Sequence, residues 1–221
     1  MENYLILASS SPGRKELLQK IGITPNLIIA PNISEEVRKG EAAYEYIKRL
    51  AQEKAMIIFD PKNLQSLGTS NKNIIYIIAA DTTVVRGSKI IGKAENAESA
   101  KGILKLLSGN RHTVLTAFCV IKAIKIADKN EYKIVNKPII KVNKSTVSVK
   151  KLSEQEINWY LESDQWQGKA GGYEVTGIFE LFIKQINGSL SNIIGLPLLS
   201  IYNSLLGLGY PFNYIKGRVI D

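Results

Sequence analysis

Hydrophobic residues recur along the chain both in short runs and in helical stripes, so the pattern predicts strands and helices together. Apolar runs between polar stretches predict strands over residues 4–8, 27–33 and 74–80. Residues 41–58 repeat apolar positions at helical spacing and predict an amphipathic helix. Its apolar stripe comprises Ile47, Leu50, Ala51, Ala55 and Ile58.

Residue types that suit helix ends mark further helices. Ser11 is a good N-cap, and Gly22 suits the turn after a helix that follows it. Ser153 and Glu156 form a capping box that opens another helix. Helices are thus expected over residues 12–21, 97–107, 153–161 and 197–206.

The remaining segments complete an α/β pattern. Residues 60–73 are rich in Asn, Ser, Gly and Pro and predict a surface loop. Because strands and helices alternate while residues 113–149 look antiparallel, the sequence predicts an α/β fold with a mixed sheet. The further strands are predicted over residues 113–121, 132–135, 139–149 and 179–186.

The composition is that of a folded globular protein. Hydrophobic residues make up 45% and charged residues 22% of the 221 positions, which excludes a disordered chain and indicates one large or two small domains. The longest uncharged apolar runs span seven residues, against the roughly 20 that cross a bilayer. The one cysteine, Cys119, cannot form an internal disulfide. We therefore expect a soluble, cytoplasmic protein without membrane contact.

The net charge of +9 indicates a polyanionic partner, either a nucleic acid or the phosphates of small nucleotides. Much of the excess lies in residues 122–151, which hold nine lysines against Asp128 and Glu131. The segment reads either as a hairpin with a solvated, lysine-coated face or as a nucleic-acid contact. Because arginines and aromatic residues are sparse there, the solvated hairpin is favoured and no stable nucleic-acid complex is expected.

Residues 9–14 carry the features of an anion site. A strand, a polar turn and a helix start bring unpaired backbone N–H groups and the positive end of the helix dipole together. Ser9, Ser10 and Ser11 add hydroxyl groups, and Arg14 adds a planar cationic fork that suits phosphate oxygens. An ordinary capped helix would explain the same residues.

Charged residues elsewhere could complete such a site. Asp81 follows the apolar run 74–80, where α/β folds place ligands, and it could be a general base, a metal ligand or a turn cap. Glu35 could supply a second carboxylate. The sequence holds no Walker P-loop and no zinc-ligand spacing, and its single histidine, His112, excludes a histidine cluster. Three lysines could form a polyphosphate clamp with Arg14 or be solvated surface residues: Lys54, Lys93 and Lys169.

Five sequence blocks, taken in order, carry a family resemblance. They are LILASSSPGRKELL (5–18), AADTTV (79–84), residues 92–116, KAGGYEVTG (169–177) and NGSLSNIIGLPL (187–198). In the same order, they are similar to five blocks found together in one protein family: a Ser-x-Ser-Pro-Arg-Arg block, an Ala-Asp-Thr block, a Gly-Lys-Pro helix with a Leu-Ser-Gly-x-x-His stretch, a Lys-Ala-Gly block and an Asn-Val-Val-Gly-Leu-Pro block. The chain thus resembles the Maf family of nucleoside triphosphate pyrophosphatases, once described as septum-formation inhibitors.

The resemblance implies an elongated α/β fold of the Maf/ITPase-like kind, a mixed β-sheet flanked by helices with a central cleft. It implies a single domain over residues 1–221, with two lobes around the cleft, and a homodimer. The implied reaction is hydrolysis of the α–β phosphoanhydride of a nucleoside triphosphate to a monophosphate and pyrophosphate, with Mg²⁺ or Mn²⁺. The implied biological role is either cleansing of the nucleotide pool or cell-division arrest.

Residue roles also follow from the resemblance. Asp81 would be the proton acceptor that activates water, and Glu35 would hold the metal together with Asp81. The implied phosphate-binding set is Ser9, Arg14, Lys54, Lys93 and Lys169.

Three positions bear on the choice of base. Gly13 stands where the family usually has an arginine, and Thr176 where the dTTP/UTP branch has a glutamine. Thr82 keeps that branch's residue, so this branch is the nearest. The rival hypothesis from another class is a non-catalytic, basic protein that binds nucleic acid or regulates division, and a phosphatase releasing orthophosphate is a third.

Overall fold

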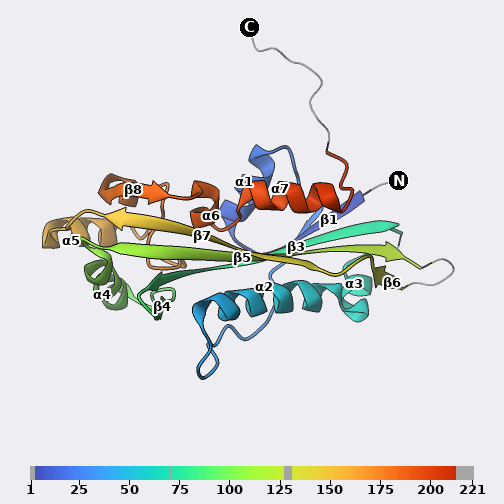
Figure 1. Ribbon diagram of the computed structural model, residues 1–221, viewed down its shortest axis with the longest axis horizontal. Helices are drawn as coiled ribbons and strands as arrows, with labels where there is room; N and C mark the ends of the chain where they lie inside the picture. Colours follow the sequence, from blue (N-terminus) through green and yellow to red (C-terminus); the bar gives the residue numbers. More distant parts are fainter. Residues whose placement is uncertain (1–2, 70, 127–130, 213–221) are drawn as a thin grey trace, which may run out of the picture.

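A long, twisted β-sheet forms the middle of the computed structural model, which describes residues 3–69, 71–126 and 131–212 (Figure 1). Its strands are β1 (Asn3–Ala8), β2 (Leu27–Ile28), β3 (Ile74–Arg86), β4 (Lys89–Ile91), β5 (Arg111–Lys125), β6 (Tyr132–Ile134), β7 (Ile139–Val149) and β8 (Ile183–Asn187). The helices are α1 (Pro12–Lys20), α2 (Ala43–Phe59), α3 (Pro61–Ser66), α4 (Ala97–Leu107), α5 (Glu154–Glu162), α6 (Leu190–Ile194) and α7 (Leu198–Gly207), with a 3₁₀ helix at Ile178–Phe182.

The sheet is mixed, as the sequence predicts. Its strand order is β2-β1-β3-β5-β7-β8, with β4 paired to β3 and β6 paired to β5. β1 runs parallel to β2 and β3, whereas β5 is antiparallel to β3, β6 and β7. The α/β class and the antiparallel character of residues 113–149 are therefore confirmed.

Helices cover both faces of the sheet. α2 and α3 lie on one face, and α1, α6 and α7 lie on the other, while α4 and α5 pack near one end (Figure 1). The whole predicted stripe of α2 is buried, from Ile47 to Ile58, and it packs on β3 and β5 residues such as Ile77 and Ile121. Each large aliphatic side chain buried in this way stabilises the fold by about 1.5–3 kcal/mol. This packing fixes α2 against the sheet. It therefore also fixes the positions of the polar side chains along the edge of the helix.

β3 differs from the prediction in a way that matters for the site. The sequence predicts a strand that ends at residue 80, but β3 continues through Asp81 because its antiparallel pairing with β5 extends to Val85. Its parallel pairing with β1 stops at Ala79, opposite Ala8. Asp81 therefore lies within a long strand, just past the carboxyl end of β1.

Three other predicted segments are also corrected. The strand predicted over 27–33 is only Leu27–Ile28, because β1 ends and leaves later residues without a partner strand. The loop predicted over 60–73 contains α3, whose start is capped by the Asp60 carboxylate, an acceptor from Lys62 N at 2.9 Å. The strand predicted over 179–186 begins as a 3₁₀ helix, and the short α6 before Gly195 was not predicted.

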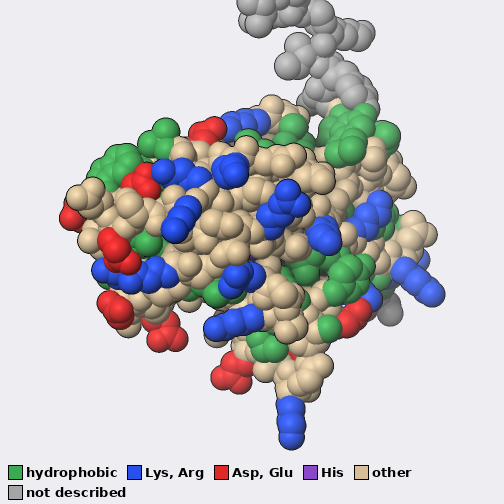
Figure 2. All heavy atoms as spheres, turned by 60° about the vertical axis from the view of Figure 1, so that its left-hand side comes forward, with side chains coloured by type: hydrophobic (Ala, Val, Ile, Leu, Met, Phe, Trp, Pro, Cys, Tyr) green, Lys and Arg blue, Asp and Glu red, His purple; other side chains and the backbone are tan. Residues whose placement is uncertain are grey.

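The lysine-rich segment forms part of the antiparallel sheet. Lys141 and Lys144 on β7 are exposed, whereas Lys122 on β5 is half-buried and donates to a backbone carbonyl after α7 at 2.6 Å. Asp128 and Lys129 lie outside the described residues. Figure 2 shows Lys and Arg side chains dispersed over one face of the molecule, while Asp and Glu gather toward one edge of the view. In the described part of the chain, no helix is long and apolar enough to cross a membrane.

Candidate active site

A cavity of about 470 Å³ opens where the carboxyl end of β1, the start of α1 and residues 167–175 meet. This volume lies in the range of sites for small molecules. Nine of the ten site residues proposed from the sequence line it: Ser9, Gly13, Arg14, Glu35, Lys54, Asp81, Thr82, Lys93 and Lys169. The tenth, Thr176, lies outside the lining.

Two carboxylates and one ammonium group form a charged cluster in the cavity lining. Lys54 on α2 donates from Nζ to Asp81 Oδ1 at 2.5 Å and to Glu35 Oε1 at 2.6 Å. The side chains of Lys54 and Asp81 are only 8% and 12% exposed. Because buried charges are costly unless they are paired, this cluster holds the three groups in one arrangement. The sequence separates them by up to 46 positions, so only the fold shows that they meet.

The Glu35 carboxyl is held in its ionised form. Partial burial acts to raise its pKa, but the hydrogen bond from Lys54 and the charges of Lys54, Lys93 and Arg14 together lower it. Lys93 Nζ lies 3.7 Å from Glu35 Oε2. Glu35 is therefore an anion at neutral pH and can act as a ligand or acceptor.

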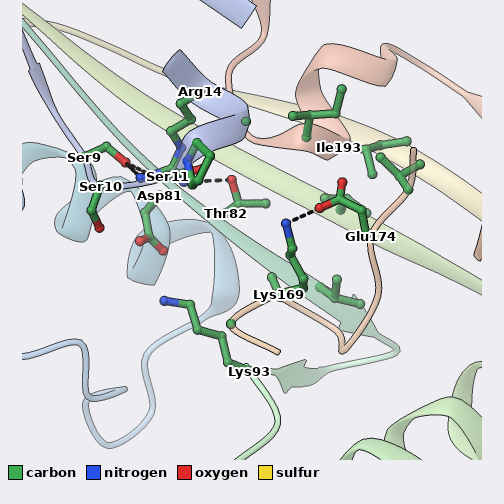
Figure 3. A pocket seen from close by; sticks show the side chains of 18 of the residues that line it. Ser9, Ser10, Ser11, Arg14, Asp81, Thr82, Lys93, Lys169, Glu174 and Ile193 are labelled. Carbon is green, nitrogen blue, oxygen red and sulfur yellow. Dashed lines mark hydrogen bonds and ion pairs between the residues drawn. The ribbon is translucent and has the colours of Figure 1, made fainter. Parts of the chain in front are cut away.

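Arg14 brings to the cavity a positive charge on a guanidinium that is held by three hydrogen bonds. Its Nε donates to Gly195 O at 2.8 Å, Nη1 to Ser9 Oγ at 2.9 Å and Nη2 to Thr82 Oγ1 at 3.2 Å (Figure 3). All three partners are neutral. Burial lowers the pKa of the guanidinium, and the charges of Asp81 and Glu35 oppose that shift. Arg14 is thus oriented by neutral groups and keeps its charge for an anion in the cavity.

The start of α1 forms the adjoining wall. Ser9 N donates to Leu7 O at 2.9 Å, and Ser11 N donates to Ser9 Oγ at 3.3 Å, so the chain turns sharply after β1. Ser11 is the N-cap, as predicted, although its side chain makes no capping hydrogen bond. The first-turn residues Pro12 and Gly13 line the cavity, so the positive end of the helix dipole faces it.

Lys93 and Lys169 are brought together by backbone pairing. Lys93 forms an isolated antiparallel bridge with Ala170, and Gly171 N donates to Gly92 O at 3.0 Å. Gly171 has φ +71°, and a Cβ there would lie 2.6 Å from a methyl group of Val84. Only glycine fits this close approach. The glycine-rich segment therefore acts first to bring two lysines to one cavity.

The sequence analysis missed Glu174, which lines the same cavity. Its carboxylate forms an ion pair with Lys169 and accepts a hydrogen bond from Thr176 Oγ1 at 3.1 Å (Figure 3). Its only signal in the sequence is that it is the single acidic residue between Gly168 and Gly177. The lining also holds apolar side chains, Val84, Val114, Val175, Ile193 and Ile194. Of these, Ile193 lies on the side of Glu174 away from Asp81 (Figure 3). The cavity thus has a charged end and an apolar end.

Two of the proposed specificity positions have structural partners of their own. The Thr82 hydroxyl accepts from Arg14 and shares a hydrogen bond with Thr116 Oγ1 at 2.9 Å, so it orients the guanidinium. A Cβ on Gly13 would lie 2.9 Å from Ile194 Cγ2. A larger residue at position 13 would therefore require Ile194 to move.

His112 lies behind the cavity wall rather than in it. It is buried, and its Nε2 shares a hydrogen bond of 2.8 Å with the hydroxyl of Tyr173, a lining residue. Burial lowers the pKa of His112 to about 4. The imidazole is thus neutral at pH 7 and serves to hold Tyr173.

We expect His112 to make the protein less stable in weak acid. Its folded-state pKa is depressed, so the unfolded chain binds the proton first and stability falls from about pH 6.5 to about pH 4. At about 1.4 kcal/mol per pH unit, the free energy of unfolding should drop by roughly 3 kcal/mol from this residue. Urea unfolding at several pH values would measure it. The His112→Asn variant should show a shallower decline than the parent and than Tyr173→Phe, and equal slopes in all three would contradict the assignment.

The sequence matches the family described as Maf-like protein over residues 4–208. It is 40% identical over 214 residues to a protein of Zymomonas mobilis subsp. mobilis named dTTP/UTP pyrophosphatase, covering 96% of this chain and 95% of that one. It is also 40% identical over 206 residues to a Rickettsia akari protein named nucleoside triphosphate pyrophosphatase, covering 93% and 94%.

Among solved structures, the Staphylococcus aureus Ham1 protein aligns with 67% of this chain and 71% of its own, at 14% identity and a TM-score of 0.29.

Proposed function

The chain belongs to the Maf family, and on that premise we propose that it is a nucleoside triphosphate pyrophosphatase. It hydrolyses the α–β phosphoanhydride of its substrate to a nucleoside monophosphate and pyrophosphate. The observation that carries the proposal is the Asp81–Lys54–Glu35 cluster, set in a cavity whose lining holds three further cations and, toward one end, apolar side chains. A triphosphate and a nucleoside have this same division of charged and apolar parts.

Asp81 acts as the general base. Its carboxylate accepts a proton from water as the water oxygen bonds to phosphorus and the bridging P–O bond breaks, with the electron pair leaving on the departing phosphate. Lys54 fixes Asp81 for this task through the 2.5 Å hydrogen bond. Arg14, Lys93 and Lys169 neutralise the charge on the phosphate oxygens, which is most of what phosphoryl transfer requires.

Glu35 and Asp81 would hold a divalent cation, Mg²⁺ or Mn²⁺. No group of three or more His, Cys, Asp or Glu side chains is gathered for a metal among the described residues. The side chains that the structure describes therefore do not alone form a complete metal shell. The two carboxylates, which already share the Lys54 ammonium, instead fit a site in which oxygen atoms of the substrate phosphates complete the shell. When bound, the metal would supply further charge neutralisation at the phosphates.

The apolar end of the cavity receives the nucleoside. We propose that Gly13 shapes it through its contact with Ile194, while Thr82 and Thr176 act on base choice indirectly, through Arg14 and Glu174. The names of the relatives make dTTP and UTP the first substrates to test.

The purified protein incubated with Mg²⁺ or Mn²⁺ and a panel of dTTP, UTP, CTP, GTP and base-modified triphosphates would test the proposal. Monophosphate and pyrophosphate are the expected products. Diphosphate and orthophosphate would point to the phosphatase. Turnover of no substrate, together with strongly salt-dependent binding to long polyanions, would establish the non-catalytic, basic protein instead.

Replacing Glu174 should strengthen substrate binding. In Glu174→Gln the Lys169 ammonium loses its carboxylate partner and becomes free for phosphate, so the KM for triphosphates should fall by up to about fivefold, the worth of a partly exposed ion pair. Steady-state kinetics with the matched variant Glu180→Gln, an exposed acid outside the cavity lining, provides the control. A raised KM would show that Glu174 contributes to binding rather than competing for Lys169.

A further inference from the structure

Glu35 lies in residues 29–42, the segment before α2, which has no regular secondary structure. All of residues 34–40 are exposed. Such a segment would ordinarily sample many conformations. Yet Glu35 has to stay within hydrogen-bond distance of Lys54 for the cluster to exist. Something outside the cavity must therefore fix this segment.

Arg49 on α2 makes the largest set of contacts to the segment. Its Nε donates to Glu41 Oε1 at 2.6 Å, and its Nη2 donates to Glu41 Oε2 at 2.7 Å and to Glu36 O at 3.0 Å. The Arg49 and Glu41 side chains are only 13% and 10% exposed. This two-pronged geometry is the strong form of an arginine–carboxylate pair. The remaining nitrogen, Nη1, donates to Glu53 at 3.1 Å.

A second contact reaches the backbone of Glu35 itself. Tyr46, one helical turn before Arg49, donates its hydroxyl to Glu35 O at 2.8 Å. Residues 46, 49 and 53 share one face of α2 at helical spacing, and Lys54 follows directly. The same helix thus holds the backbone of Glu35 with one residue and its carboxylate with another.

The charges of the Arg49 contact are fully developed at neutral pH. The hydrogen bonds from Arg49 lower the pKa of Glu41 to about 2, and Glu41 raises the pKa of Arg49 in turn. Both partners of the Arg49–Glu41 contact are therefore charged at neutral pH, and the ion pair is intact there.

We propose that Arg49 and Tyr46 are positioning residues that place the Glu35 carboxylate against Lys54 and the substrate phosphates. Neither residue lines the cavity itself; both act through Glu35, which does. The inference rests on the proposed function for its kinetic consequences, although the geometry of Glu35 can be observed without turnover. Misplacement of a reacting group by about 1 Å costs up to about a hundredfold in rate, which sets the scale of the effect.

Two conservative variants test the proposal. Arg49→Lys keeps the charge but loses the planar fork, and Tyr46→Phe removes one hydroxyl. We expect kcat to fall by about tenfold to a hundredfold in Arg49→Lys and less in Tyr46→Phe, with KM changed less than threefold. Arg111→Lys is the matched control, since Arg111 is an exposed arginine on β5 outside the cavity lining. It should behave as the parent.

A double-mutant cycle separates positioning from a structural role. In a Glu35→Gln background, Arg49→Lys should have less than a twofold further effect on kcat, because the group it positions is gone. An equal loss in both backgrounds, or a kcat like that of the parent, would overturn the proposal.

An NMR spectrum of the lysine ammonium groups gives a readout that needs no activity. The Lys54 Nζ signal should shift in Arg49→Lys and in Glu35→Gln but not in Arg111→Lys. If the parent protein hydrolyses no triphosphate, the proposed function fails, and this signal still decides the positioning role. An unshifted signal in Arg49→Lys would reject that role.

Discussion

Asp81→Asn should abolish turnover while leaving nucleotide binding in place. The amide cannot accept the proton of the attacking water, and loss of a general base typically costs about 10²–10⁴-fold in rate. The side chain keeps its size and Lys54 keeps its ion pair with Glu35, so the arginine and lysine residues of the cavity stay where they are. We expect a decrease in kcat of at least about a thousandfold, measured as pyrophosphate release from the best triphosphate of the panel.

The control for this substitution is Asp60→Asn. Asp60 also bears a single carboxylate in a defined contact, the cap of α3, but it lies outside the cavity lining. Its variant should keep the kcat of the parent. Calorimetric binding of a non-hydrolysable triphosphate to Asp81→Asn, within about tenfold of the parent, would complete the case. A variant that turns over at the parent rate would remove Asp81 from the mechanism.

Lys54→Met should damage both activity and stability. The substitution keeps the length of the side chain but leaves Asp81 and Glu35 facing each other without the cation that joins them. Removing one partner of a buried charge pair costs about 3–5 kcal/mol, and the 43% exposure of Glu35 places this case at the lower end. At this chain length, about 3 kcal/mol corresponds to a fall in Tm of roughly 10 °C.

Lys54→Met should lower kcat by more than the loss of one positive charge would explain. Asp81 loses the hydrogen bond that orients it, so kcat should fall by at least about a hundredfold. Lys48→Met, on the same helix but in an exposed pair with Glu45, is the matched control and should change neither quantity. Tm from calorimetry and kcat from pyrophosphate release check the two halves separately. If Lys54→Met kept its kcat, the cluster would be structural rather than catalytic.

The sequence predicts best those parts of the fold that depend on local patterns. The α2 stripe, the capping box at Ser153 and the turn at Gly22 all rest on residues close together in the chain, and the structure confirms each of them. The extent of β3 is different. Asp81-Thr82-Thr83 reads locally as a strand end, and only pairing with β5, more than 30 residues later, continues the strand.

The candidate site shows the same division. Cations and carboxylates could be singled out by residue type and family blocks, and nine of the ten positions do share one cavity. What the sequence could not show is which groups are already engaged. Lys169 forms an ion pair with Glu174, and the Thr82 hydroxyl accepts a hydrogen bond from Arg14. Arg49 holds the residue next to Glu35 through the Glu36 carbonyl. These partners come from other elements, so their contacts exist only in the folded chain.

The hydrogen bond between Arg14 and Gly195 determines at which point of synthesis the chain can form its complete site. The two residues lie 181 positions apart, and the carbonyl of Gly195, at φ +122°, closes one side of the guanidinium. A nascent chain holding the first half of the sequence contains Ser9 and Thr82, two of the three hydrogen-bond partners of Arg14, but lacks the Gly195 carbonyl. Contacts of such long range form late in folding, since loop closure must come first. The phosphate end of the cavity is thus completed only when the last helices dock, so a partly made chain has no working site.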